Sequence, residues 1–226
     1  MFFKPGIYSK PNSSAFANLV SLLHMDGPNG SFTFTDETGM VWGISGTDAQ
    51  ITTSEFVYGG ASGSFTNGRY VTPSTPQAGY AFGTNDLTIE MRVRFTDGAA
   101  NRYFFGLPGA SPNIWMYRQS SNGELIVHFG GSTFGTGILS SLNTWYAIAI
   151  SRVSGTLYIF IDGVLTNSNL VVADFGATNR SPTIGHAAGL VGAPQWHIGQ
   201  VDEYRCFNGV GLYTSSYTPT GPFPNP

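Results

Sequence analysis

The sequence has little charge and almost no cysteine. Its 226 residues include 10 Lys and Arg against 13 Asp and Glu, so the net charge is -3 and charged residues make up 10%, whereas a typical soluble domain has about 25%. Such sparse cations form no basic stripe, which excludes nucleic acid as a partner bound through its phosphates. The single cysteine, Cys206, excludes an internal disulfide framework and a cysteine-based zinc site, and we expect it to be a small buried side chain.

Long apolar runs are also missing. The N-terminal residues Met-Phe-Phe-Lys-Pro-Gly lack the charged and then apolar regions of a secretory signal. No stretch approaches the roughly 18 apolar residues needed to cross a bilayer. We therefore expect a protein that is made in the cytoplasm without a signal peptide and has no membrane partner.

Glycine, proline and aromatic residues are abundant instead. The 30 glycines and 13 prolines interrupt every stretch long enough for a helix. The chain is 41% hydrophobic and 14% aromatic, which favours a packed core over disorder. Its length suits one large all-β domain. With so few ions, the surface must consist mainly of Ser, Thr, Asn, Gln and Gly.

Short alternating segments between turn residues predict a β-sandwich. Apolar and polar residues alternate strictly over 87–95, so this strand has a buried face and a wet face on which Glu90 and Arg92 form an exposed ion pair. Asp162-Gly163 predicts a hairpin turn after a strand pair at 146–151 and 156–161, with a further strand at 164–166. Other predicted strands are 18–24, 50–53, 61–65, 70–71, 114–118, 125–129, 183–186 and 195–207.

The two ends of the chain differ from its body. Residues 1–17 hold both lysines, two prolines and three phenylalanines, and residues 218–226 hold four prolines, too many for a central strand. We therefore divide the chain into an extended N-terminal arm (1–17), a sandwich (18–217) and a Pro-rich C-terminal tail (218–226). The arm packs either along its own domain or along a neighbouring molecule.

Several segments resemble a known family when they are taken in order. They are Leu22-Leu23-His24-Met25-Asp26-Gly27, Phe34-Thr35-Asp36-Glu37-Thr38-Gly39, 58–65, 82–90, 143–152, 157–163, Gly199-Gln200-Val201-Asp202-Glu203-Tyr204-Arg205 and 211–223. Together they resemble the laminin-G-like, concanavalin A-like jelly-roll domains. More narrowly, they are similar to a variant in virion proteins of tailed bacteriophages, where a D-E-V-R strand precedes A-R-Y-T-x-x-F-x-P-P-x-x-P-F. This sequence departs from that variant at Gly211-Leu212, Tyr217 and Thr220.

The resemblance implies a two-sheet antiparallel jelly-roll sandwich but does not fix a function. We expect a non-enzymatic structural protein of the virion surface, such as a capsid decoration (cement) protein or a head or tail surface protein. It would contact other virion proteins and form a homo-oligomer, with Phe2, Phe3, Tyr8 and Phe16 as anchors, because buried aromatic residues dominate interfaces.

The alternative is a carbohydrate-binding, lectin-like adhesin that recognises the host. Its candidate glycan-binding residues are Trp115, Tyr117, Gln195 and Trp196, which lie near predicted loops or strand ends. Packing in the core or at an interface is the competing interpretation of these tryptophans. Trp145 matches a core tryptophan of the family, so we assign it a structural role.

The sequence gives little support for catalysis. The E-x-D-x-x-E strand of glycosidases on this fold is absent, since Arg92 stands where an acid is needed. Asp202 and Glu203 are adjacent on a strand and are expected to point to opposite faces, one of them pairing with Arg205 or capping a turn. The four histidines, His24, His128, His186 and His197, are scattered, and we expect structural roles for them, although His186 and His197 have the potential to meet in space. We expect no enzyme activity.

Calcium is the one plausible cofactor, because many laminin-G-like domains hold it at the rim of the sandwich. The candidate ligands are Asp26, Asp36, Asp48 and Asp86, which lie in turn contexts. Each aspartate can instead cap its own turn. Since no D-x-D-x-D cluster is present, we expect no bound cofactor.

Overall fold

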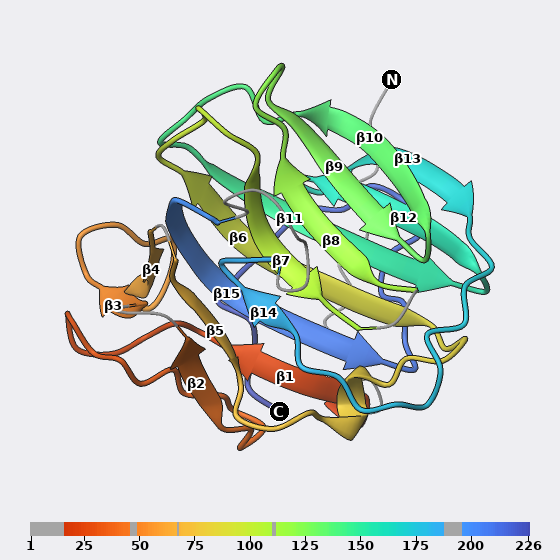
Figure 1. Ribbon diagram of the computed structural model, residues 1–226, viewed down its shortest axis with the longest axis horizontal. Helices are drawn as coiled ribbons and strands as arrows, with labels where there is room; N and C mark the ends of the chain where they lie inside the picture. The colour runs from red at the N-terminus through yellow and green to blue at the C-terminus, as the bar shows by residue number, and fades with distance from the viewer. Residues whose placement is uncertain (1–15, 46–48, 67, 110–111, 188–195) are drawn as a thin grey trace.

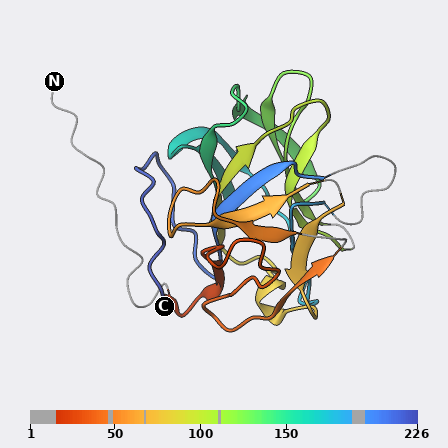
Figure 2. The same cartoon turned by 90° about the vertical axis from the view of Figure 1, so that its left-hand side faces the viewer.

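The computed structural model describes residues 16–45, 49–66, 68–109, 112–187 and 196–226, and these form two antiparallel sheets stacked face to face (Figures 1 and 2). One sheet runs in the order β13 (Val164–Leu170), β12 (Thr156–Ile161), β11 (Trp145–Val153), β6 (Leu87–Phe95), β15 (Gly199–Asn208), β4 (Ser62–Phe65) and β3 (Gln50–Thr52), and β1 (Leu19–Leu23) pairs with β15. The other runs β10 (Ser132–Ile138), β9 (Glu124–Phe129), β8 (Ile114–Arg118), β7 (Arg102–Leu107), β14 (Thr183–Ile184), β5 (Tyr70–Pro73) and β2 (Trp42–Ser45). The predicted two-sheet antiparallel jelly-roll sandwich is confirmed.

Most strands lie where the alternation predicts them. Asp162 and Gly163 have φ angles of 50° and 75°, so this hairpin turn has the left-handed backbone that its sequence indicates. The strands β2, β7 and β10 have no counterpart in the sequence prediction. A single turn of 3-10 helix, η1 (Ala78–Tyr80), precedes β6. None of the described segments forms a helix long and apolar enough to cross a bilayer.

The core fills the space between the two sheets. The apolar side chains of β6 at positions 87, 89, 91, 93 and 95 are fully buried there, as their alternation predicts. Cys206 is also fully buried in this core, and burial raises the pKa of its thiol well above the usual value. The cysteine is therefore the buried side chain that we expected.

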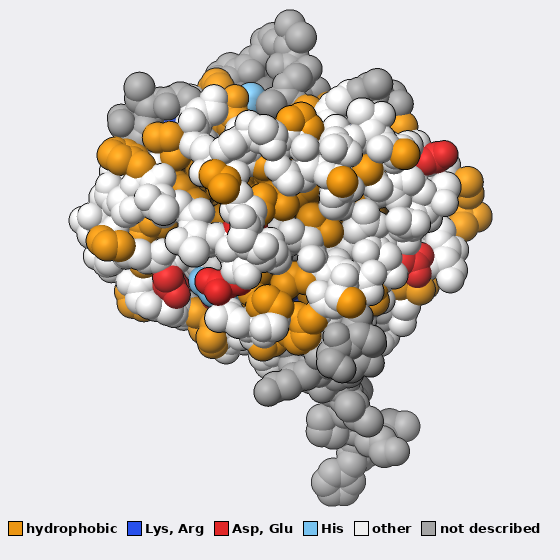
Figure 3. Space-filling model, turned by 90° about the horizontal axis from the view of Figure 1, so that it is seen from below, with side chains coloured by type: hydrophobic (Ala, Val, Ile, Leu, Met, Phe, Trp, Pro, Cys, Tyr) orange, Lys and Arg blue, Asp and Glu red, His pale blue; other side chains and the backbone are white. Residues whose placement is uncertain are grey.

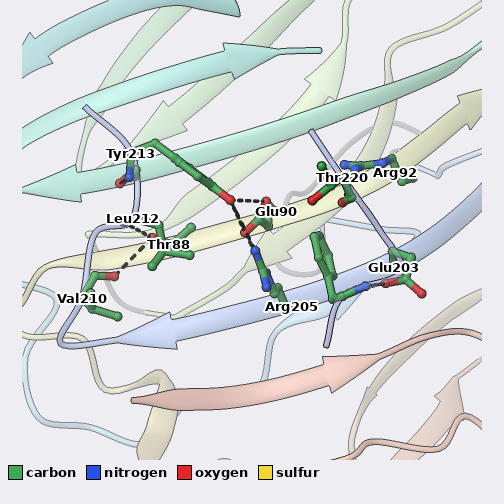
Figure 4. A network of polar contacts seen from close by, with 11 residues as sticks. Thr88, Glu90, Arg92, Glu203, Arg205, Val210, Leu212, Tyr213 and Thr220 are labelled. Atoms are coloured by element: carbon green, nitrogen blue, oxygen red, sulfur yellow. Dashed lines mark hydrogen bonds and ion pairs between the residues drawn. The ribbon is translucent and has the colours of Figure 1, made fainter. Parts of the chain in front are cut away.

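The outer face of the eight-stranded sheet is covered by residues 210–225, which we call the C-terminal strap (Figure 2). Glu90 and Arg92 are only 1% and 5% exposed, so the prediction of a wet face with an exposed ion pair is wrong. Glu90 instead accepts a hydrogen bond of 2.7 Å from Arg205 Nε and one of 3.2 Å from Tyr213 Oη. Arg92 donates to the Thr220 carbonyl at 3.0 Å (Figure 4).

A β-bulge in β15 places two consecutive acidic residues under the strap. Val201 and Tyr204 both face the core, and Glu203 between them has a φ of 51°. Both carboxylates therefore make contacts on the outer side, and the prediction that they point to opposite faces is wrong. Asp202 accepts hydrogen bonds from the amides of Val57 and Tyr58, which is the turn-capping role that we predicted for one of the pair. Burial raises the pKa of Asp202 to about 7.

The buried ion pair makes a direct prediction about stability. Glu90→Ala should lower the free energy of unfolding by about 3–5 kcal/mol, because it leaves the buried Arg205 guanidinium without its carboxylate. Glu55 pairs with Arg94 at 3.4 Å, and its side chain is 47% exposed. Glu55→Ala should therefore lower the free energy of unfolding by less than about 1 kcal/mol. Urea unfolding measures the free energy of unfolding of both variants. Equally small losses of stability in both would contradict a buried Glu90–Arg205 ion pair.

A second prediction concerns the pH dependence of the strap. His24 contacts Glu203 through Nδ1 at 2.7 Å and Asn225 through Nε2 at 2.6 Å, and the bond to Glu203 raises the pKa of His24 to about 9. The pKa of His24 in the folded protein exceeds its unfolded value of about 6.5. The stabilisation that protonated His24 provides is therefore complete below pH 6.5 and is lost as the pH rises through about 9. The difference in Tm between the native protein and His24→Gln should shrink over that range. A difference that stays constant with pH would count against this assignment.

Candidate functional site

Aromatic side chains gather on the outer face of the seven-stranded sheet. On β8, Ile114 and Met116 face the core, so Trp115 and Tyr117 between them point outward. We define the aromatic face by the outward side chains Tyr70, Tyr103, Trp115, Tyr117, His128, His186 and Trp196, which make ring contacts with one another. The structure thus brings three of the predicted glycan-binding residues to one surface. The fourth, Gln195, lies outside the described residues.

Cross-strand pairing stacks the rings at the centre of this face. Tyr103 on β7 lies opposite Tyr117, with ring centroids 4.2 Å apart and an interplanar angle of 17°. His128 on β9 lies opposite Trp115, with centroids 4.8 Å apart and an angle of 30°. Such pairs contribute about 0.5–1.5 kcal/mol beyond their burial. Each ring also covers one face of its partner, so only the remaining faces and edges are available to a ligand.

A second group of rings continues the face toward β5. His186 stacks on Trp196 at 4.0 Å and packs against Tyr70 at 5.0 Å. Gly106 makes this approach possible, because a Cβ atom there would come within 3.0 Å of the His186 carbonyl oxygen. Gly106 also pairs with Trp115 in the sheet. Gly106 therefore lies between the two ring groups, next to Trp115 and His186.

The aromatic face is uncharged at neutral pH. Burial lowers the pKa of His186 to about 4 and holds the pKa of His128 below its usual value, so both imidazoles are neutral. Within the part of the chain that the structure describes, Trp115 Nε1 and His186 Nδ1 are buried without a hydrogen-bond partner. Both nitrogens are shielded from solvent, so the face presents ring surfaces and not these polar atoms.

The other predicted aromatic residues have separate places. Phe16 is half-buried just before β1, and Phe2, Phe3 and Tyr8 lie outside the described residues. Trp145 is half-buried at the start of β11, whereas its neighbour Tyr146 belongs to the core. The expectation that Trp145 is a core tryptophan is therefore wrong, because the alternation of β11 turns this side chain outward.

The histidines and aspartates serve local structural contacts. His197 packs between Phe65 and Phe95, so its ring has different neighbours from that of His186. The Asp36 carboxylate accepts hydrogen bonds from the side chains of Ser21, Thr38 and Trp42 and from backbone amides, and Asp86 accepts from the Ser154 amide. Asp26 packs against Gly59, and Asp48 lies outside the described residues. Among the described residues, no three His, Cys, Asp or Glu side chains are grouped as a metal site requires.

Comparison with known families identifies the fold. A family model described as the concanavalin A-like lectin/glucanases superfamily matches residues 65–211, which is more than half of the chain. The chain belongs to this superfamily. Membership agrees with the two antiparallel sheets and confirms the broader resemblance found in the sequence, while the narrower similarity to bacteriophage virion proteins stays a prediction. A comparison with curated protein sequences finds no match.

Several solved structures align over most of the chain. Domain 4 of AbnA, an extracellular GH43 arabinanase from Geobacillus stearothermophilus solved in complex with arabinotriose, gives a TM-score of 0.63 at 18% identity, covering 85% of this chain and 93% of that domain. The binding domain of Paraclostridial Mosquitocidal Protein 1 gives 0.64 at 13% identity, covering 87% of this chain and 50% of that one. Trypanosoma rangeli sialidase gives 0.60 at 19% identity and covers 92% of this chain but 34% of the sialidase. Identities this low show the fold alone.

Proposed function

We propose that this chain is a non-enzymatic carbohydrate-binding domain that contacts a neutral glycan through its aromatic face. The observation that carries the proposal is the set of outward rings on the seven-stranded sheet, three of which sequence analysis already singles out. Aromatic rings pack against the C–H surfaces of a sugar, and tyrosine hydroxyl groups donate and accept hydrogen bonds as sugar hydroxyl groups do. The arabinotriose complex of the similar AbnA domain supports this ligand class.

The charge of the face favours a neutral glycan over an acidic one. All seven residues that define the aromatic face are uncharged at neutral pH, because burial keeps His128 and His186 deprotonated. Recognition of carboxylate or sulfate groups would require cations such as arginine, whose planar fork matches an anion. The low overall charge of the chain agrees with this choice.

The environment of the buried carboxylates supports a role without catalysis. Hydrolysis with retention needs two carboxyl groups about 5–5.5 Å apart that reach the substrate. Glu90, Asp202 and Glu203 gather under the C-terminal strap and accept hydrogen bonds from side chains and amides of the protein itself. These three carboxylates hold the strap and loops in place and face away from the aromatic face, on the other sheet.

Ring removal tests the proposed site. We predict that Tyr117→Ala and Trp196→Ala each weaken glycan binding about tenfold or more, a loss of about 1.4 kcal/mol, because they remove contact area from the face. Tyr158→Ala removes a half-buried tyrosine from β12 of the other sheet and should leave binding unchanged. Titration calorimetry measures binding of a glycan selected on a glycan array, and circular dichroism checks folding. A blank array together with blank whole-cell binding would refute the proposal.

We infer a second function, which is compatible with the first: a structural protein of the virion surface in a tailed bacteriophage, bound to other virion proteins and assembled as a homo-oligomer. The observation that favours it concerns the motif that carries the narrower resemblance. The motif consists of a strand at 202–205 and the segment 211–223, and these two parts contact each other. Glu203 accepts a hydrogen bond from the Phe223 amide, and Arg205 donates one to Tyr213 Oη at 3.3 Å. Because the two parts of the motif form one set of contacts, the motif supports a relationship to virion proteins of tailed bacteriophages.

Truncation of the N-terminal arm tests the virion role. Deletion of residues 1–17 should abolish incorporation of the protein into phage particles, because the arm carries the proposed anchors Phe2, Phe3, Tyr8 and Phe16. The truncated chain should remain folded, since the core lies within the sandwich. Mass spectrometry of purified particles reports the copy number. Unchanged incorporation of the truncated, folded protein would refute the role of residues 1–17 as the anchor to the virion.

A further inference from the structure

A groove lies at the end of the sandwich where β1, η1 and the last residue of β15 meet. It has a volume of about 730 Å³, and its lining residues include Asn18, Val20, Met40, Gln77, Asn85 and Asn208. None of the residues that define the aromatic face lines it. Seen from the lower side of Figure 1, the molecule shows mostly uncharged and hydrophobic side chains with a few acidic ones (Figure 3). We call this cavity the amide groove.

Hydrogen bonds fix the amide side chains at the base of the groove. Asn85 Nδ2 donates to Asn208 Oδ1 at 2.9 Å, and Asn208 Nδ2 donates to the Gly79 carbonyl at 3.0 Å. The backbone amide of Asn208 also donates to the Asn18 carbonyl at 3.0 Å. The groove is therefore assembled from several chain segments that are held together before any ligand arrives, which reduces the entropy lost on binding.

The lining selects a ligand by hydrogen bonding without charge. No lining residue is ionisable at neutral pH. Side-chain amides both donate and accept hydrogen bonds, as the hydroxyl groups of a sugar do, whereas a carboxylate only accepts and an ammonium only donates. Four amide side chains line the groove, Asn18, Gln77, Asn85 and Asn208. Asn85 Nδ2 and Asn208 are engaged in the hydrogen bonds above, and Gln77 Nε2 donates to the Thr75 carbonyl at 2.7 Å. The side-chain oxygens of Gln77 and Asn85 are therefore the acceptors that the groove offers to hydroxyl groups.

The rest of the lining is apolar and small. Val20 and Met40 are partly buried and pack against the core, so they present a fixed apolar wall. Gly79 leaves no space for a side chain on the side of Val20, because a Cβ atom there would lie 2.5 Å from Val20 Cγ1. A Cβ atom at Gly39, by contrast, would meet nothing within 4 Å. The groove therefore offers an apolar wall and open volume beside its amides.

We propose that the amide groove is a second carbohydrate subsite, which binds a neutral, hydroxyl-rich sugar unit independently of the aromatic face. The choice of ligand class rests on the proposed carbohydrate function, but the residues and the geometry are separate. The hydroxyl groups of the sugar contact the amides, and its C–H surface contacts Val20 and Met40.

Residue-resolved NMR distinguishes the two sites. The full chain, labelled with ¹⁵N, is titrated with maltotriose, cellotriose and xylotriose at millimolar concentrations. We expect at least one of these sugars to shift the amides of Gly39, Gly79 and Gly209. Shifts confined to the aromatic face would overturn the second subsite and leave the proposed function standing. An absence of shifts with all three sugars would overturn the subsite as well.

Two variants test the assignment without disturbing the core. Asn85→Leu removes an exposed amide together with its hydrogen bond to Asn208, and it should weaken binding in the groove about tenfold or more, as expected for the loss of a good hydrogen bond. Gly39→Asn places a side chain in the open volume, and asparagine tolerates the φ of 82° at this position; it should abolish the shifts of Gly79 and Gly209. Asn169→Leu on β13 is the matched control and should bind as the native protein does. Unchanged binding in folded Asn85→Leu and Gly39→Asn would refute the subsite.

Discussion

The burial of a charged strand face under the C-terminal strap is the constraint on which the rest of the structure depends. Glu90 and Arg205 are each 1% exposed, and the Arg205 guanidinium lies 3.8 Å from the centre of the Phe223 ring. Buried charges are tolerated only when they are paired and hydrogen-bonded, so this sheet requires the strap. The strap occupies the outer face of the eight-stranded sheet, and the aromatic rings lie on the outer face of the seven-stranded sheet, where we propose that a glycan binds.

The sequence predicted which residues share a strand face but not what covers that face. Alternation over β6 assigned its core side correctly. It assigned the polar side to solvent, because the polarity of these residues does not reveal that residues 210–225 cover them. The bulge at Asp202 and Glu203 escaped prediction because Glu203 adopts a left-handed φ without being glycine. Strand β10 was missed because Gly135 and Gly137 dilute its alternation.

The candidate site was predicted in part. Trp115 and Tyr117 stand two residues apart on a predicted strand, so their common face follows from the period of a strand. Tyr103 and His128 were missed because their place beside these rings depends on the register between β7, β8 and β9, which lies beyond a single strand pattern. The Tyr70 and Trp196 rings stack with centroids 6.3 Å apart and both contact His186, and this cluster depends on tertiary packing around Gly106.

The two outer faces differ in what lies on them: the strap covers one, and neutral aromatic rings lie on the other. A crystal structure of the full chain with the tightest glycan from the array tests the proposed glycan site most directly. We expect sugar in contact with Trp115, Tyr117 or Trp196, with the C-terminal strap still in place over Glu90 and Arg205. Sugar bound on the eight-stranded sheet with the strap displaced would contradict it.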